Sequence, residues 1–298
     1  MTLEEKIRQV AAGMEAADLF FGHGTANAFD EACWLVSSTI GLKPDFPPEA
    51  FARTLTTDER ARVDAVAAER VRTRKPLAYL LGEAWLAGLS FEVDESVLVP
   101  RSPLAELIVS GFEPWLPMER LQRAVDVGTG SGCLAIALAH HWPGVSVDAL
   151  DISAAALELA RRNARRHQVD DRVRCLRSDL LDGVPGRRYD LILANPPYVP
   201  CASMAQLPAE FRHEPELGLV AGADGLDLVR RLLIQAPEHL SEHGILVCEV
   251  GEAAEAVERL LDERIERTWL EFEYGGEGVF LLDHGACRAA SRWLDQQQ

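Results

Sequence analysis

The stretch VDVGTGSGCLAIALA, residues 125–139, joins a short apolar run, alternating glycines and a helical pattern. The apolar run predicts a buried strand, and the pattern after the glycines predicts a helix. Alternating glycines let the backbone approach a ligand closely, and a helix N-terminus supplies N–H groups without partners. The stretch therefore predicts a strand, a ligand-binding loop and a helix in succession.

The same alternation of strand and helix patterns continues from about residue 121 to the end of the chain. Apolar runs that predict strands stand at 123–127, 145–150, 173–179, 189–195 and 245–250. Strands of this kind with helices between them predict an α/β fold with a mostly parallel sheet covered on both faces. Two last runs, 267–274 and 278–283, flank glycines and predict an antiparallel hairpin that closes the sheet.

The first hundred residues follow another pattern. Helices are expected at about 3–20, 28–40 and 57–74. Thr56 and Glu59 form a capping box at the start of the third helix, and Pro76 follows its end. Alternation over residues 84–99 predicts a β-hairpin with its turn at residues 94–96. The expected domains are a helical domain (1–82), a hairpin linker (83–100) and an α/β domain (101–298).

The composition narrows the class of protein. The 298 residues are 48% apolar and carry a net charge of −17, which favours a basic partner over a phosphate backbone. The N-terminus lacks the pattern of a signal peptide, and no apolar run reaches the length of a membrane span. The six cysteines have no Cys-x-x-Cys spacing, which is typical of reduced thiols. We therefore expect a cytoplasmic protein without a metal.

Acidic residues follow the strands in an order that suits a nucleoside ligand. Asp151 at the end of the second strand is suited to ribose hydroxyls, and Asp179 after the third is suited to an adenine amino group. The glycine spacing, G-x-G-x-G, suits a pyrophosphate less well than the dinucleotide motif does. S-adenosylmethionine is a nucleoside without pyrophosphate, and Asp126 would offer a negative charge to its cationic groups. The alternative is a set of ordinary turn glycines and strand-end acids.

A second stretch, ANPPYVP at residues 194–200, ends the fourth expected strand. Proline donates no hydrogen bond to a sheet, so the strand must stop there. The Asn195 carboxamide and the Pro196 carbonyl are rigid acceptors for the hydrogens of a planar amide or amino group, against which Tyr198 can stack. Two such acceptors stabilise the positive charge that develops when this nitrogen attacks a methyl group. The alternative is a plain Pro-Pro turn.

Taken together, these motifs resemble the HemK-type protein glutamine N5-methyltransferases, which are class I S-adenosylmethionine-dependent enzymes. The resemblance covers most of the chain and rests on Val99–Arg101, Asp126–Gly132, Asp151–Ser153, Ser178–Asp179, Asn195–Tyr198 and Phe211–Pro215. It implies a Rossmann-like, seven-stranded, mostly parallel sheet. It also implies S-adenosylmethionine as the methyl donor, S-adenosylhomocysteine as the product and no metal.

The resemblance also assigns site residues. It implies a cofactor site made of Asp126, Gly128, Thr129, Gly130, Ser131, Gly132, Asp151, Asp179, Leu180 and Asn195. It implies a substrate site made of Arg101, Asn195, Pro196, Pro197 and Tyr198, of which Asn195, Pro196 and Tyr198 are catalytic. Leu180 stands where relatives often carry an aromatic residue beside adenine. An ordinary ion pair is the alternative for Arg101. A solvated loop is expected at His213 and Glu214, with a substrate-binding pair as the alternative.

The family has two bacterial branches, which differ in substrate. One modifies the Gly-Gly-Gln loop of peptide-chain release factors, and the other a glutamine of the third protein of the large ribosomal subunit. Ser102–Glu106, Phe20–Thr25 and Arg212–Leu219 resemble the ribosomal branch. The resemblance thus implies methylation of that basic protein, free or in an assembling subunit, with release factors as the alternative.

Two other classes of protein share some of these features. A DNA adenine-N6 methyltransferase would use the same Asn-Pro-Pro-Tyr clamp on a flipped base. The acidic composition and the lack of a separate target-recognition domain argue against it, so no specific DNA binding is expected. A cofactor-binding module on the ribosome would keep the glycine loop but has no need of the Asn-Pro-Pro-Tyr stretch.

Overall fold

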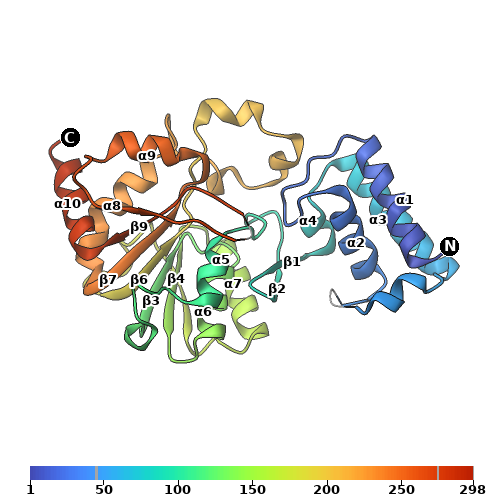
Figure 1. The fold of residues 1–298 in the computed structure, drawn as a ribbon, viewed down its shortest axis with the longest axis horizontal. Helices are drawn as coiled ribbons and strands as arrows, with labels where there is room; N and C mark the ends of the chain where they lie inside the picture. The colour runs from blue at the N-terminus through green and yellow to red at the C-terminus, as the bar shows by residue number, and fades with distance from the viewer. Residues whose placement is uncertain (44–45, 274, 298) are drawn as a thin grey trace.

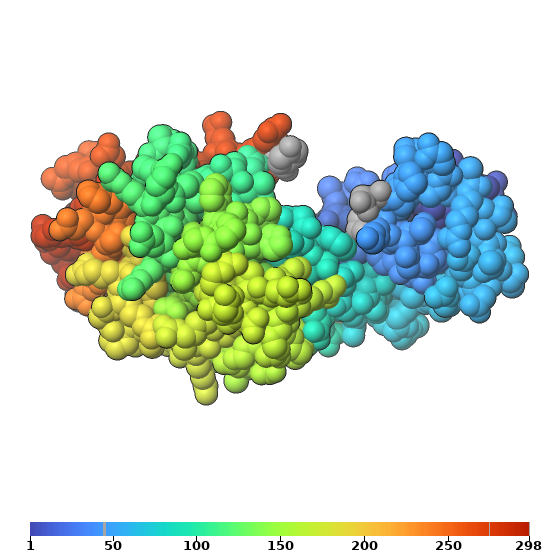
Figure 2. Space-filling view, turned by 90° about the horizontal axis from the view of Figure 1, so that it is seen from below, coloured from blue at the N-terminus to red at the C-terminus, as the bar shows by residue number. Residues whose placement is uncertain are grey.

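The structure is a computed structural model that describes residues 1–43, 46–273 and 275–297. Figure 1 shows a helical unit at the N-terminus, in blue and cyan, and a larger unit built on a sheet. The hairpin β1–β2 lies between the two units. Figure 2 shows an elongated molecule whose surface is hollowed between the units. No helix in the described ranges is long and apolar enough to cross a membrane.

Packing of amphipathic helices builds the N-terminal unit. Its elements are α1 (Leu3–Ala16), α2 (Ala28–Thr39), η1 (Pro48–Ala52), α3 (Thr57–Thr73) and α4 (Leu77–Leu81). Ile7, Leu35 and Val63, one from each of the three longer helices, are fully buried in its core. The expected capping box is present, because Thr56 Oγ1 accepts from the Glu59 N–H at 3.1 Å and Glu59 Oε2 accepts from the Thr56 N–H at 2.9 Å.

Two sequence predictions in this part differ from the structure. Helix α1 ends at Ala16 and not near residue 20, because Asp18 takes a left-handed φ of +50°. The hairpin pairs β1 (Glu83–Leu86) with β2 (Leu89–Glu92), so its turn lies at Ala87 and Gly88 and not at residues 94–96. Both turn residues have positive φ, the geometry that matches the twist of a two-residue hairpin.

The larger unit contains a seven-stranded, mostly parallel sheet, as the sequence predicts. Its strands are β3 (Arg123–Val127), β4 (Ser146–Asp151), β5 (Val173–Arg177), β6 (Tyr189–Ala194), β7 (Leu240–Glu249), β8 (Thr268–Trp269) and β9 (Val279–Asp283). The spatial order is β5-β4-β3-β6-β7-β9-β8, and only the two pairings of β9 are antiparallel. The closing hairpin is therefore present, but β8 has two residues, fewer than expected; Tyr274, in the predicted run, lies outside the described residues.

Helices cover both faces of the sheet. They are α5 (Leu104–Ser110), α6 (Cys133–His141), α7 (Ala154–Arg166), α8 (Asp227–His239), α9 (Ala254–Leu260) and α10 (His284–Asp295). Successive residues of β6 point to opposite faces, so Leu191 packs in the core with α5 and α6 while Ile192 packs in the core with α8 and α10. The sequence patterns above did not predict α10. The connections contain the 3-10 helices η2 (Met118–Arg120), η3 (Cys201–Gln206), η4 (Ala209–His213), η5 (Glu216–Gly218) and η6 (Gly251–Ala253).

Candidate active site

The sheet has a topological switch point between β3 and β6. From β3 the chain continues to β4 and β5 on one side, and from β6 it continues to β7 on the other. In open α/β sheets, ligands bind at the carboxyl ends of the strands beside such a point. A cavity of about 1730 Å³ lies there and is lined by the glycine loop and by the Asn-Pro-Pro-Tyr stretch. Because pockets for small ligands have volumes of roughly 300–1,000 Å³, this cavity has room for a cofactor and a substrate segment.

The glycine loop joins β3 to α6 in a conformation that requires glycine. Gly128, Gly130 and Gly132 have positive φ values of 77°, 54° and 82°. A Cβ on Gly132 would lie 3.0 Å from Ala160 Cβ, so this glycine also lets α6 pack against α7. Thr129 and Ser131 line the cavity between these glycines. The loop thus presents backbone to the cavity at the start of a helix.

Asp126 lies beneath this loop and not among the described residues that line the cavity. Its Oδ2 accepts from Thr129 Oγ1 at 2.5 Å and from the Ala135 N–H at 3.3 Å, and these bonds draw the carboxylate inward. The position differs from the acidic rim expected from sequence. Burial raises the pKa of Asp126 to about 6, and Oδ1 has no hydrogen-bond partner among the described residues. A buried carboxylate oxygen without a donor suits a nearby cationic group.

Asp151, Asp179 and Leu180 all line the cavity. Asp151 lies next to the glycine loop, because its Oδ2 accepts from the Gly130 N–H at 2.9 Å. Its Oδ1 accepts from the Ser153 N–H at 2.8 Å. The Ile152 N–H also faces this carboxylate, and the lone pairs that these three N–H groups do not use remain for a hydroxyl group. Burial raises the pKa of Asp151. Asp179 forms an ion pair of 2.8 Å with Arg231 on the cavity wall, and Leu180 is largely buried beside it.

The four residues of the Asn-Pro-Pro-Tyr stretch line the same cavity, where β6 ends. Pro196 and Pro197 stand between Asn195 and the aromatic ring of Tyr198. A Cβ on Gly251 would lie 2.8 Å from that ring, so a glycine there makes room for it. Burial raises the pKa of the Tyr198 hydroxyl to about 12, and the ring is neutral at ordinary pH. The structure brings the amide, the prolines and the ring together beside the glycine loop.

Arg101 lines the cavity, but its charge is engaged by Glu214. Its guanidinium donates to both oxygens of Glu214, at 2.5 and 2.6 Å, and lies over the Phe211 ring. Glu214 also accepts from the Val99 N–H at 3.0 Å and lies 3.4 Å from His23 Nε2. Only 6% of Glu214 is exposed, so the prediction of a solvated loop there is wrong. Burial alone would raise the pKa of Glu214, but the contacts with His23 and Arg101 lower it to about 2.

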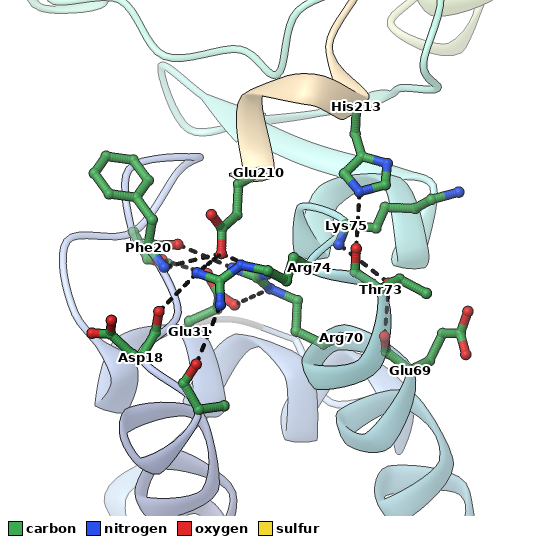
Figure 3. A network of polar contacts seen from close by, with 12 residues as sticks. Asp18, Phe20, Glu31, Glu69, Arg70, Thr73, Arg74, Lys75, Glu210 and His213 are labelled. Atoms are coloured by element: carbon green, nitrogen blue, oxygen red, sulfur yellow. Dashed lines mark hydrogen bonds and ion pairs between the residues drawn. The ribbon is translucent and has the colours of Figure 1, made fainter. Parts of the chain in front are cut away.

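Neighbouring side chains tie the cavity wall to the helical unit. Figure 3 shows Glu210, from η4, next to Arg70 and Arg74 of the helical unit. Glu210 accepts from the Phe20 N–H at 3.0 Å and forms an ion pair of 2.9 Å with Arg74. Arg70 is fully buried and lies 3.6 Å from Glu210. Since η4 lies in the segment that follows the Asn-Pro-Pro-Tyr stretch, the helical unit holds one wall of the cavity.

Glu249 is a cavity residue that the sequence patterns did not identify. It ends β7 and is 5% exposed. Its Oε2 accepts from Ser102 Oγ at 2.5 Å, and the side chain of Asn195 lies beside the carboxylate. Burial raises the pKa of Glu249 to about 7. A signal was present in the sequence, because the apolar run 245–250 carries a carboxylate as its last residue but one, near the edge of the sheet where ligands bind.

No metal site is evident among the described residues. They contain no group of three or more His, Cys, Asp or Glu side chains arranged to hold a metal ion. The cysteines are free thiols, and Cys248 and Cys287 are buried.

The family model and the curated relatives that match this chain are those of methyltransferases. The methyltransferase small domain family matches residues 107–209. The ribosomal protein uL3 glutamine methyltransferase of Xanthomonas campestris pv. campestris is 49% identical over 282 residues, 95% of this chain and 91% of that protein. The protein of the same name from Francisella tularensis is 40% identical over 284 residues, 95% and 90% of the two chains. The solved hMettl16 catalytic domain in complex with the MAT2A 3'UTR hairpin 1 has a TM-score of 0.52 and 18% identity, over 83% of this chain and 88% of that one. This last likeness concerns the fold alone.

Proposed function

Because this chain belongs to the family of ribosomal protein uL3 glutamine methyltransferases, we propose that it methylates a glutamine of uL3. The methyl group passes from S-adenosylmethionine to the side-chain amide nitrogen N5. The observation that carries the proposal is the Asn-Pro-Pro-Tyr stretch on the wall of the cavity that the glycine loop also lines. That stretch offers a planar amide two acceptors and a flat ring.

The proposed cofactor site has features that fit S-adenosylmethionine. The backbone of Gly128–Gly132 is open to a close approach, and Asp151 keeps free lone pairs for the ribose. Asp179 and Leu180 border the place proposed for adenine, while the buried Asp126 lies beneath the glycine loop, on the side proposed for the cationic methionine part, without lining the cavity. When bound, S-adenosylmethionine supplies an electrophilic methyl group on a sulfonium. S-adenosylhomocysteine is then the product, and the chemistry requires no metal.

The proposed catalytic residues act on the glutamine amide. The nitrogen of an amide is a poor nucleophile because its lone pair is delocalised into the carbonyl. Asn195 Oδ1 and the Pro196 carbonyl accept its two N–H hydrogens and stabilise the positive charge that develops on the nitrogen. One of these hydrogens then leaves as a proton to water, since an N-methylated amide nitrogen that keeps both is strongly acidic. Pro197 keeps these acceptors rigid, and the Tyr198 ring stacks on the planar amide. Held in this way, the nitrogen is aligned with the methyl group, which lowers the entropic part of the barrier.

We assign different roles to the two units of the chain. Residues 1–82 take part in recognising uL3, residues 83–100 link the units, and residues 101–298 carry the methyltransferase site. The side chain of Arg101 borders the substrate space and fixes the wall through Glu214. The net charge of −17 suits a basic ribosomal protein. We propose that the enzyme meets uL3 in the cytoplasm, either free or in an assembling large subunit.

A methylation assay with three acceptors tests this function. The protein is incubated with methyl-labelled S-adenosylmethionine and with purified uL3, a peptide-chain release factor or duplex DNA. We expect label on uL3 alone, and mass spectrometry of its peptides should find one methyl group on one glutamine. Label on the release factor would select the other branch, and label on adenine in DNA would refute the choice of a protein substrate. A parallel reaction with Asn195→Ala serves as the inactive control.

A further inference from the structure

Glu249 and Asn195 are neighbours across the carboxyl edge of the sheet. Strands β6 and β7 are parallel, and their last paired residues are Ala194 and Cys248. Asn195 and Glu249 come one position later on each strand. Directly opposed residues of neighbouring strands share a face of the sheet, so the two side chains leave on the same side. The geometry therefore sets a buried carboxylate beside the amide to which the proposed function gives the central role.

The contacts of Glu249 bear on which way the Asn195 amide is turned. Burial raises the pKa of Glu249, and the Asn195 side chain acts to lower it, which is the effect of an NH2 group that faces the carboxylate, since a carboxylate has no hydrogen to donate. The carbonyl oxygen Oδ1 then points away from Glu249. Ser102 Oγ donates to the carboxylate at 2.5 Å and limits its rotation. The two ends of the Asn195 amide are nearly equal in shape, so packing alone does not select one orientation, and the carboxylate is needed to do so.

We propose that Glu249 is a positioning residue that holds the NH2 of Asn195 and so directs the Asn195 carbonyl oxygen toward the acceptor amide. The inference rests on the proposed function in one respect, which is that Asn195 accepts a hydrogen from the substrate nitrogen. Glu249 acts through Asn195 and takes no part in bond making. It does so only when ionised, because a protonated carboxyl would offer its own O–H to Asn195 and favour the opposite orientation.

The ionisation of Glu249 falls in an accessible pH range. Burial raises its pKa to about 7, against the opposing effects of Ser102, Arg101 and Asn195. Tyr198 faces it from the segment after β6, and Cys248 precedes it on β7. Burial raises the pKa of both of these groups far above neutrality, and Arg101 stays charged throughout. Among these neighbours, Glu249 alone changes its charge between pH 6 and 8, as its pKa of about 7 implies.

The test compares pH profiles of full-length variants with uL3 as the methyl acceptor. Glu249→Gln removes the charge and, like the protonated carboxyl, can both donate to and accept from Asn195, so it neither selects the orientation nor titrates. Glu249→Leu removes the acceptor. Glu242→Gln, an exposed glutamate at the other end of β7, is the matched control. Calorimetry with S-adenosylhomocysteine and circular dichroism show whether each variant folds and binds the product.

For the wild type and Glu242→Gln, we expect kcat to fall by up to about tenfold per pH unit between pH 7 and pH 6, as for a single essential ionisation. Asp126, whose pKa burial raises to about 6, titrates at the lower edge of this range in every variant alike. Glu249→Gln should show no such fall, and its kcat at pH 8 should lie about tenfold or more below that of the wild type, because it mimics the protonated carboxyl at every pH. Glu249→Leu should lose about 10²-fold in kcat, the effect of losing one oriented polar group, with KM and product affinity little changed.

Two results would overturn the inference. One is a Glu249→Gln profile with the same fall below pH 7 as the wild type, and the other is a Glu249→Leu variant with kcat within twofold of it. If Glu249→Leu does not fold, the Glu249→Gln profile still decides. If the wild-type protein methylates another acceptor instead of uL3, the proposed substrate is refuted but this inference is not. The same comparison of variants is then made with that acceptor.

Discussion

Glu214 offers the sharpest test of how the two units are joined at the active site. Its side chain is completely buried and accepts from Arg101 and from the Val99 N–H, and it lies 3.4 Å from His23 Nε2 of the helical unit. The perturbation is Glu214→Gln, which keeps the shape and removes the charge. Because a glutamine resembles a protonated carboxyl, the comparison isolates what ionisation contributes to the free energy of unfolding.

The magnitude follows from the pKa of Glu214. The folded protein lowers it from 4.5 to about 2, although burial acts in the opposite direction. At about 1.4 kcal/mol per pKa unit, ionisation of Glu214 contributes about 3 kcal/mol at neutral pH. A depressed carboxyl pKa gives stability that is fully present above the unfolded value of 4.5. That stability is lost as the pH falls from 4.5 toward 2, because the unfolded chain takes up the proton first.

The assay is urea unfolding of the wild type and of Glu214→Gln at a series of pH values. We expect a gap of about 3 kcal/mol at pH 7 that narrows below pH 4.5 by up to about 1.4 kcal/mol per pH unit. In the difference between the two free energies of unfolding, the contributions of the carboxylates that both proteins contain cancel. Glu216→Gln, an exposed glutamate two residues along, should change the free energy of unfolding by less than about 0.5 kcal/mol. A gap below about 1 kcal/mol at pH 7, or one that stays constant on acidification, would refute the reasoning.

Three further predictions concern turnover and binding. Asn195→Asp should keep S-adenosylhomocysteine binding in calorimetry but lose about 10²-fold or more in kcat, because an anion replaces the oriented amide; unchanged turnover would remove Asn195 from the mechanism. Asp151→Ala should weaken S-adenosylhomocysteine binding about tenfold or more, since hydrogen bonds to a charged group contribute roughly 1.5–3 kcal/mol each, and unaltered calorimetry would contradict its role. Glu210→Ala should lower the free energy of unfolding by about 2 kcal/mol in urea, because Arg74 and the Phe20 N–H lose their partner while the buried Arg70 keeps Glu31; a change below about 0.5 kcal/mol would show that the contacts of Glu210 do not join the units.

Local sequence patterns predicted the parts of the fold that local physics controls. The capping box at Thr56 and Glu59 is formed within one helical turn, so neighbouring residues suffice to specify it. The hairpin turn was misplaced because the pattern Asp94–Ser96 looks like a turn, and it does form one, with Asp94 Oδ1 accepting from the Ser96 N–H. The actual hairpin turn at Ala87 and Gly88 carries a weaker signal, since alanine rarely has a positive φ.

The candidate site also contains features that the local sequence specifies and features that only tertiary packing specifies. The glycine loop and the Asn-Pro-Pro-Tyr stretch are continuous in sequence, and each marks a strand end, so the chain by itself indicated both and their shared edge of the sheet. Glu249 gained its place only when β7 paired with β6, and Glu214 gained its low pKa only when His23 and Arg101 packed against it. Burial and the approach of partners distant in sequence set the charge state and the orientation of a side chain, and these arise only when the chain has folded.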